Sequence, residues 1–351
     1  MKKSSMLKEN LLNSFIPVIL SILFGGVIIL MLGENPLHVY GILIEKSLLT
    51  EKGFMNTLHY ASPLILTGLA IAITFKANIY NMGVEGQMVF GGFFAGIVGT
   101  YLSDMNGFVA KLICFLVAIF CGMCLALIPA LLKIKCNVNE MVVTLMLNYA
   151  ILKLLEFLTT GIFRDTNAGY VATKTIEKNV MFRHWGHSRL TSFFILSMIV
   201  LIFMYFVFHH SKLGYEITAI GKNAEFAEAT GMNVGRKILL IMLISGALSG
   251  MAGAGWMMSD QFKFTLGFSS NPGLGWDGML IALLGGHSPI GVFVAAVFYS
   301  VLKTGSDSIN MYTNVPKEMI AMIQGIMILF LAVKFVHQIK ERVKPKKAHS
   351  L

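Results

Sequence analysis

Residues 109–133 read VAKLICFLVAIFCGMCLALIPALLK, an apolar stretch with no charged side chain between Lys111 and Lys133. As a helix, about 20 such residues cross the roughly 30 Å hydrocarbon layer of a membrane. Comparable stretches recur along almost the whole chain. The sequence therefore predicts an all-α polytopic membrane protein.

The composition agrees with that prediction. Of the 351 residues, 56% are hydrophobic and 13% are charged, against about 45–50% and about 25% in soluble domains. This difference excludes an ordinary soluble globular protein. The formal net charge is +10, but the lysines lie at the ends of apolar stretches, where they contact lipid head groups. We therefore expect membrane lipid and no nucleic acid as a partner.

Ten crossings fit the pattern of apolar stretches, some of them short or rich in glycine. They are 12–33, 57–75, 87–103, 109–133, 139–160, 191–209, 238–258, 276–286, 289–304 and 317–338.

Both termini are expected on the cytoplasmic side of a bacterial plasma membrane. Lys2, Lys3 and Lys8 precede the first apolar stretch, which is too long for a typical signal peptide and is expected to be retained. The tail 339–351 is basic, as the positive-inside rule requires of a cytoplasmic segment.

We expect a single transmembrane domain over residues 1–351, with two halves, 12–160 and 191–338, related by inverted topology. The motif GVEGQM at 83–88, which leads to two glycines, resembles GWDGML at 275–280, which also leads to two glycines. The two motifs are five crossings apart, an odd number, as inverted repeats require. An extracellular loop, 161–190, is expected between the halves.

Sequence motifs for catalysis are missing. The chain has no G-x-x-x-x-G-K-[ST], no H-E-x-x-H and no G-x-S-x-G. We therefore expect neither an enzyme nor a catalytic residue, no bound metal, and no cofactor held by this chain.

Carboxylates in or beside the crossings are the strongest candidates for a functional site. Glu85, Glu140, Glu156, Asp277 and Glu318 are of this kind, and a charge at membrane depth usually faces a cavity or a partner. A carboxylate in the first turn of a helix can instead interact with the helix dipole, and for the two at 140 and 318 both interpretations stay open.

Glu85 and Asp277 differ from the others because glycines flank them and interrupt the helix. A broken helix at membrane depth is tolerated only where its backbone lines protein or water. This favours a translocation pathway at both motifs, with Asn81, Gln87 and Trp276 beside the acids, although the acids could instead brace the broken backbone. Thr144 and Asn148 continue the polar stripe from Glu140, either along the pathway or in hydrogen bonds between helices.

Residues 212–237 form the one sizeable cytoplasmic connection. Asn223 is a good N-cap, Glu225 stands in the first turn, and Gly231 supplies a left-handed end, so a short helix is predicted over 224–230. It carries Phe226 among alanines. This aromatic side chain either docks into a groove of another protein or packs back on the bundle.

Several of these stretches together resemble the ABC-importer permeases of the branched-chain amino acid and simple-sugar class. Residues 221–232, GKNAEFAEATGM, and 245–253, SGALSGMAG, look like their coupling loop and the helix after it. Residues 81–87, 139–149, 276–278 and 284–289 resemble the nucleoside-type members. Asn78 and Met82 depart from the glycine and isoleucine expected there.

The resemblance implies a membrane-spanning subunit of an ATP-driven importer of nucleosides. Its implied partners are an ATP-binding cassette ATPase that binds ATP and Mg, a second permease chain, homologous or identical, and an extracellular substrate-binding lipoprotein. The implied translocation-pathway residues are Asn81, Glu85, Gln87, Glu140, Thr144, Asn148, Trp276 and Asp277. The implied ATPase-coupling residues are Gly221, Asn223, Ala224, Glu225, Phe226, Ala227 and Gly231.

Other functions stay open at this point. A permease of the same class could carry simple sugars or branched-chain amino acids. An ion-coupled secondary transporter would use Glu85 or Asp277 as its ion site and would need no ATPase.

Overall fold

The computed structural model describes residues 23–31, 33–266, 273–313, 322 and 325. It divides into two compact units, residues 58–299 and residues 1–57 with 300–351. Each unit is described by itself.

In the smaller unit, the stretch expected to connect the first two crossings contains two short helices, α2 (Pro36–Ile44) and the π-helix η1 (Glu45–Leu49). Asn35 caps α2, since its Oδ1 accepts a hydrogen bond from the Leu37 N–H at 3.0 Å, and Pro36 follows at the first helical position. The core of the unit comprises Ile29, Val39, Ile42, Leu302 and Ile309.

The larger unit is helical, and two helices, α3 (Glu51–Lys76) and α13 (Pro289–Tyr312), pass from one unit into the other. Its remaining elements are α4 (Val84–Gly99), α5 (Gly107–Cys136), α6 (Glu140–Thr160), α7 (Phe193–His210), α8 (Lys212–Lys222), α9 (Ala224–Ala229), α10 (Val234–Trp256), the π-helix η2 (Met257–Gln261) and α12 (Leu274–Leu284).

Among the described residues, six helices are long and apolar enough to cross a membrane, namely α3, α5, α6, α7, α10 with η2, and α13. α4 and α12 are apolar but shorter. Eight of the ten predicted crossings coincide with these helices, whereas most of 317–338, most of 12–33 and the tail 339–351 lie outside the described residues. The all-α membrane fold is confirmed, while the count of ten crossings and the inverted relation of the halves stay predictions.

The short helix α4 packs against α5 and α10 through glycines. A Cβ atom added at Gly91 would lie 2.8 Å from the Cα of Gly250, and one added at Gly253 would collide with the carbonyl of Met88. Gly246 of α10 meets Gly122 of α5 in the same way. Small residues let the backbones of membrane helices approach closely, so the α10 sequence SGALSGMAG fixes the position of α4.

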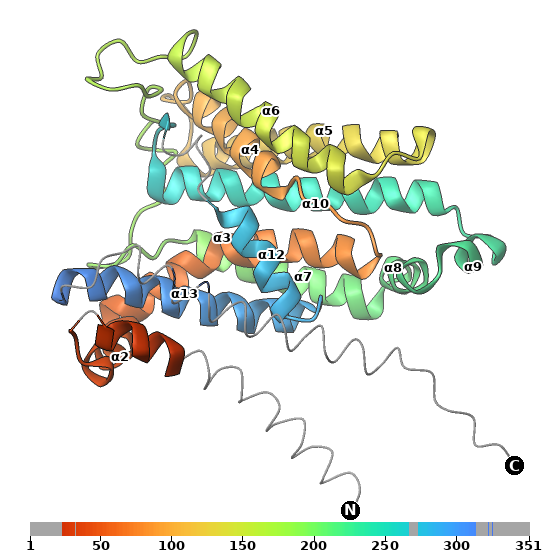
Figure 1. Ribbon diagram of the computed structural model, residues 1–351. Coiled ribbons are helices and arrows are strands. Elements are labelled where there is room, and N and C mark those ends of the chain that lie inside the picture. The colour runs from red at the N-terminus through yellow and green to blue at the C-terminus, as the bar shows by residue number, and fades with distance from the viewer. Residues whose placement is uncertain (1–22, 32, 267–272, 314–321, 323–324, 326–351) are drawn as a thin grey trace, which may run out of the picture. The chain divides into compact units, whose positions relative to one another are not determined.

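Residues 161–190, predicted as an extracellular loop, pack over one end of this bundle. The N–H groups of Thr173 and Ile176 donate to the carbonyls of Phe264 and Phe262 at 2.9 and 2.8 Å. Ile176 and Val180 are buried. Helices α8 and α9 lie at the opposite end, beyond the start of α10 (Figure 1).

Candidate functional site

The segment between α3 and α4 is held by the amide of Asn81. Its Oδ1 accepts from the Gly83 N–H at 3.0 Å, and its Nδ2 donates to Ser245 Oγ at 2.9 Å. Asn81 and Gln87 also exchange hydrogen bonds at 3.1 and 3.2 Å. Because Ser245 in turn donates to the Ala70 carbonyl at 2.6 Å, this one amide joins the broken backbone to α10 and α3.

The polar stripe of α6 faces the same segment. Thr144 Oγ1 accepts from the Met82 N–H at 3.1 Å, while Asn148 Nδ2 donates to the Met82 carbonyl at 2.6 Å. Asn148 Oδ1 accepts from the Gly86 N–H at 2.9 Å. The two side chains thus satisfy backbone groups that the helix break leaves open, which matches the hypothesis of hydrogen bonds between helices.

Glu140 combines the two roles considered for it. It stands in the first turn of α6, directly after the N-cap Asn139. Its carboxylate pairs with Lys133 Nζ at 2.7 Å and accepts from the Tyr80 N–H at 3.3 Å. It therefore ties the α5–α6 turn to the segment that enters α4.

Glu156, at the other end of α6, behaves differently. Its side chain is 45% exposed and pairs with Lys153 on the preceding turn at 2.8 Å, so it is not buried among the described helices, and a place beside a cavity or a partner stays a prediction. Glu318 lies outside the described residues.

Glu85 joins the two glycine-flanked motifs. Its Oε1 accepts from the Gly273 N–H at 2.9 Å, and its Oε2 accepts from the Gly275 N–H in the first turn of α12. A Cβ atom at Gly275 would lie 2.6 Å from the backbone of Glu85, so glycine is required for this approach. The carboxylate of the first motif therefore caps the helix of the second motif.

Trp276 and Asp277 are half-buried, in contrast to the other six predicted pathway residues, all of which are buried. Asp277 Oδ1 accepts from the Tyr299 hydroxyl at 2.6 Å. A cavity of about 10 Å³, the size of one water molecule, is lined by Ile71, Asn81, Met82, Val84, Glu85, Gly275, Trp276 and Met279. The structure thus brings both motifs together and leaves only this small space between them.

The predicted short helix between α8 and α10 is confirmed as α9, which ends one residue earlier than expected. Asn223 caps it, since its Oδ1 accepts from the Phe226 N–H at 2.9 Å. Gly231 has φ = +86° and ends it. Phe226 is 68% exposed, whereas Ala227 is buried. Within the described residues Phe226 does not pack back on the bundle, and its docking into another protein stays a prediction.

The other predicted coupling residues divide between the surface and the bundle. Ala224 and Glu225 are exposed beside Phe226. A Cβ atom at Gly221 would collide with the Lys76 carbonyl. The end of α8 therefore contacts the end of α3, where the chain turns into the segment that carries Asn81.

The α12–α13 turn lies beside that same end of α3. The ring of His287 is 5.7 Å from that of Phe75, whose other neighbour is Tyr80 at 5.1 Å. Burial, and then the positive charge of Lys76, lower the pKa of the His287 imidazole, so the ring is neutral at pH 7.

Two features escaped the sequence analysis. One is α8, which Ser211 caps and whose Leu213, Ile217 and Ile220 follow helical spacing. The other is a polar and aromatic cluster in which His59 of α3 meets Asp260 of η2. An ionisable residue inside an apolar stretch could have pointed to the cluster.

Comparisons with known proteins agree with this architecture. Residues 53–332 match the family described as branched-chain amino acid transport system / permease component. The chain is 30% identical to the nucleoside ABC transporter permease protein NupB of Lactococcus lactis, with 94% of this chain and 93% of that protein covered. It is also 30% identical to the guanosine ABC transporter permease protein NupP of Bacillus subtilis, over 97% and 99% of the two chains. Against the glucose ABC transporter permease protein TsgB13 of Haloferax volcanii, the identity is 29% over 90% and 85%.

No solved structure gives a significant match. The family match covers most of the chain and includes the α3–α4 segment, α9 and α12. The protein therefore belongs to the family of branched-chain amino acid transport system permease components, and it is a multi-pass membrane protein that acts as a transport subunit.

Proposed function

We propose that this chain is the membrane-spanning subunit of an ATP-driven importer of nucleosides. It would work with an ATP-binding cassette ATPase, a second permease chain and an extracellular substrate-binding lipoprotein. The observation that carries the proposal is the exposed Phe226 on a capped helix, in a chain that matches nucleoside and guanosine permeases over nearly its whole length.

The exposed side chains of the coupling segment suit an ATPase partner. Phe226 and Tyr215 are 68% and 69% exposed, on α9 and α8. Exposed aromatic side chains of this kind are typical anchors in protein interfaces. The segment itself is firmly attached, because Lys237 of α10 pairs with Glu216 of α8 at 2.7 Å.

A continuous series of contacts leads from this segment to the predicted pathway. α8 touches the end of α3 at Gly221, α3 continues directly into the segment braced by Asn81, and Glu85 on α4 holds the start of α12. Closure of the ATPases against α9 would move these elements together and open the small space between the two motifs. Asn81, Glu85, Gln87, Glu140, Thr144 and Asn148 would then act by positioning the backbone, with Trp276 nearest the substrate.

Uptake by cells that lack this chain tests the proposal. Uptake of radiolabelled guanosine at low concentration should be lost, while leucine and ribose uptake persist. Loss of leucine or sugar uptake with normal guanosine uptake would assign the chain to another branch of the class.

The source of energy separates this proposal from ion-coupled transport. Uptake should stop when cellular ATP is depleted and should survive a protonophore. The opposite pattern would favour a secondary transporter that uses Glu85 or Asp277 as its ion site.

A further inference from the structure

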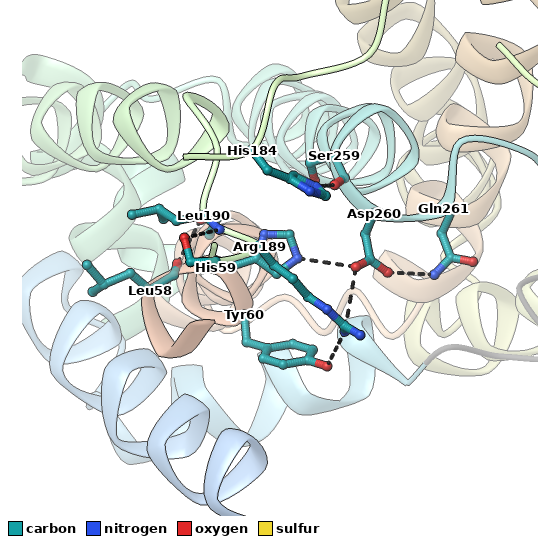
Figure 2. A network of polar contacts seen from close by, with 11 residues as sticks. Leu58, His59, Tyr60, His184, Arg189, Leu190, Ser259, Asp260 and Gln261 are labelled. Atoms are coloured by element: carbon teal, nitrogen blue, oxygen red, sulfur yellow. Dashed lines mark hydrogen bonds and ion pairs between the residues drawn. The ribbon is translucent and has the colours of Figure 1, made fainter. Parts of the chain in front are cut away.

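A second cluster of polar and aromatic side chains lies at the end of α3 and α10 that is distant from α9. It combines His59 and Tyr60 of α3, Trp256 at the end of α10, and Asp260 of η2. Arg189, from the loop before α7, reaches into it (Figure 2).

Buried polar atoms in this cluster are left without a hydrogen-bond partner. His59 is 1% exposed, and within the described chain its Nδ1 has no partner. Its Nε2 lies 3.4 Å from Asp260 Oδ1, which is long for a hydrogen bond. The buried Ser259 Oγ also has no partner among the described residues. Because buried polar groups are almost always paired, these atoms require a polar partner beyond the described chain, either a water molecule or a bound ligand.

Aromatic faces adjoin these atoms. The ring of Trp256 lies 5.4 Å from that of His59 and 6.0 Å from that of Tyr60, with interplanar angles of 34° and 36°. The three rings pack on one another, with Trp256 6% exposed, in the offset arrangements that flat aromatic groups prefer. Any nucleobase can stack on an aromatic side chain, since every base has a π-face.

A carboxylate stands at the edge of the rings. Asp260 is 18% exposed, and its Oδ2 accepts from Gln261 Nε2 at 2.9 Å. A carboxylate can accept more than one hydrogen bond, and in dinucleotide sites an Asp or Glu accepts one from the ribose 2′-hydroxyl.

Arg189 connects the loop to both helices. Its Nη1 donates to the Tyr60 hydroxyl at 3.3 Å and lies 4.0 Å from Asp260 Oδ1, and the side chain is 57% exposed. Figure 2 shows the guanidinium between the phenol of Tyr60 and the carboxylate of Asp260.

The same two helices carry this cluster and the Asn81 brace. His59 is eleven residues from Ala70 on α3, and Trp256 is eleven residues from Ser245 on α10, where Ser245 bonds to Ala70. Eleven residues of helix span about 16 Å. The cluster and the small space between the motifs therefore lie about 16 Å apart along α3 and α10.

We propose that His59, Tyr60, Trp256 and Asp260 form a nucleoside-binding site at the end of the bundle opposite α9. The base packs on Trp256 and Tyr60, the ribose diol donates to Asp260, and His59 hydrogen-bonds to the base. Arg189 holds the loop over the site. This inference rests on the proposed function and adds to it the residues that recognise the substrate.

Direct binding tests the site independently of transport. Saturation-transfer NMR with millimolar guanosine is measured on the purified complex of permease and ATPase in nanodiscs, without the binding lipoprotein. Signal transfer to the base and ribose protons is expected for the wild type and for Trp256→Phe, and at least a fivefold weaker signal for Trp256→Leu. Tyr101→Leu, which removes an exposed aromatic side chain from the turn between α4 and α5, serves as the control. No transfer in the wild type, or equal transfer in Trp256→Leu, would overturn the proposal.

Substrate choice separates recognition from packing. Asp260→Asn should lower guanosine uptake about tenfold and 2′-deoxyguanosine uptake much less, so that the ratio between them falls toward one. Asp104→Asn, an exposed carboxylate at the same end, should keep the wild-type ratio. An equal loss of both substrates in Asp260→Asn, or an unchanged ratio, would show that the cluster only packs the helices. Failure of the wild type to transport any nucleoside would instead count against the proposed function.

Discussion

The segment around Asn81 and the helix α9 differ in the burial of their side chains and in the partners that those side chains have. In the first, the buried side chains of Asn81 and Asn148 hydrogen-bond with backbone and side-chain groups of the chain itself. The second presents Phe226 on its outside, with nothing of the described chain covering it.

The difference separates two meanings of an unusual residue in a membrane protein. A polar side chain among apolar helices is costly unless it is paired, and here Asn148 and Thr144 pair with a broken backbone. An apolar side chain outside the helices loses the gain of burial unless another protein covers it. A paired polar residue of the first kind stabilises this chain. An exposed apolar residue of the second kind indicates contact with another protein.

Replacement of Asn148 should give the largest effect on stability. Asn148→Leu leaves the Gly86 N–H and the Met82 carbonyl without partners, at about 1–3 kcal/mol each, so the free energy of unfolding should fall by about 2–6 kcal/mol. Thermal unfolding in detergent measures this loss. Met146→Ala, an exposed side chain of the same helix, should change it by less than about 0.5 kcal/mol. Normal stability of Asn148→Leu together with altered transport would mean that Asn148 lines the pathway rather than braces it.

Replacement of Phe226 should affect coupling and leave stability unchanged. Loss of an aromatic anchor costs about 2 kcal/mol at an interface, which corresponds to roughly thirtyfold weaker association with the ATPase. Phe226→Ala should therefore stay folded, bind the ATPase less tightly and uncouple ATP hydrolysis from guanosine uptake. Gly231→Val, which forces a β-branched residue to positive φ, should also uncouple the two.

The control for this prediction is Tyr101→Ala, which removes an equally exposed aromatic side chain from the turn between α4 and α5. It should leave ATPase binding and uptake unchanged. Fully coupled transport by both Phe226→Ala and Gly231→Val would rule out α9 as the contact with the ATPase.

The contrast also explains what the sequence could predict. α9 depends on local signals, the cap Asn223 and the left-handed Gly231, and both act as expected. Apolar stretches of sufficient length predicted most of the helices. The short helix α8 was missed because it directly follows α7 and reads as part of a polar connection.

Contacts between residues far apart in the chain could not be predicted from the sequence. Nothing local shows that Glu85 meets Gly273, 188 residues away, or that His59 meets Asp260. The flanking glycines singled out Glu85 and Asp277, but only the structure shows that glycine at position 275 makes room for Glu85. The sequence thus identified polar candidate residues by their type. Their roles depend on the partners that tertiary packing brings next to them.

Thiol labelling probes the space between the motifs. In a chain without Cys114, Cys121, Cys124 and Cys136, a small hydrophilic reagent should react faster with Trp276→Cys than with Val84→Cys. The reason is that Trp276 is half-buried and Val84 is buried. Guanosine or trapped nucleotide should change both rates severalfold. If neither cysteine reacts in any state while others in α4 and α12 react readily, the motifs only pack and the pathway follows other faces.

The two glutamates of α6 give the smallest and most direct comparison. Glu156 pairs with Lys153 while both side chains are 45% or more exposed, and exposed ion pairs contribute about 0–1 kcal/mol. Glu156→Gln should therefore change the unfolding free energy by less than about 0.5 kcal/mol and leave guanosine uptake intact. Glu140→Gln, in the same helix, removes the charge that pairs with Lys133 and weakens the contact with Tyr80. Glu140→Gln should lower the unfolding free energy more than Glu156→Gln does, because hydrogen bonds to charged groups contribute about 1.5–3 kcal/mol. Equal losses would mean that burial does not set the role of a carboxylate here, and abolished transport in Glu156→Gln would place that side chain at an interface with a partner subunit.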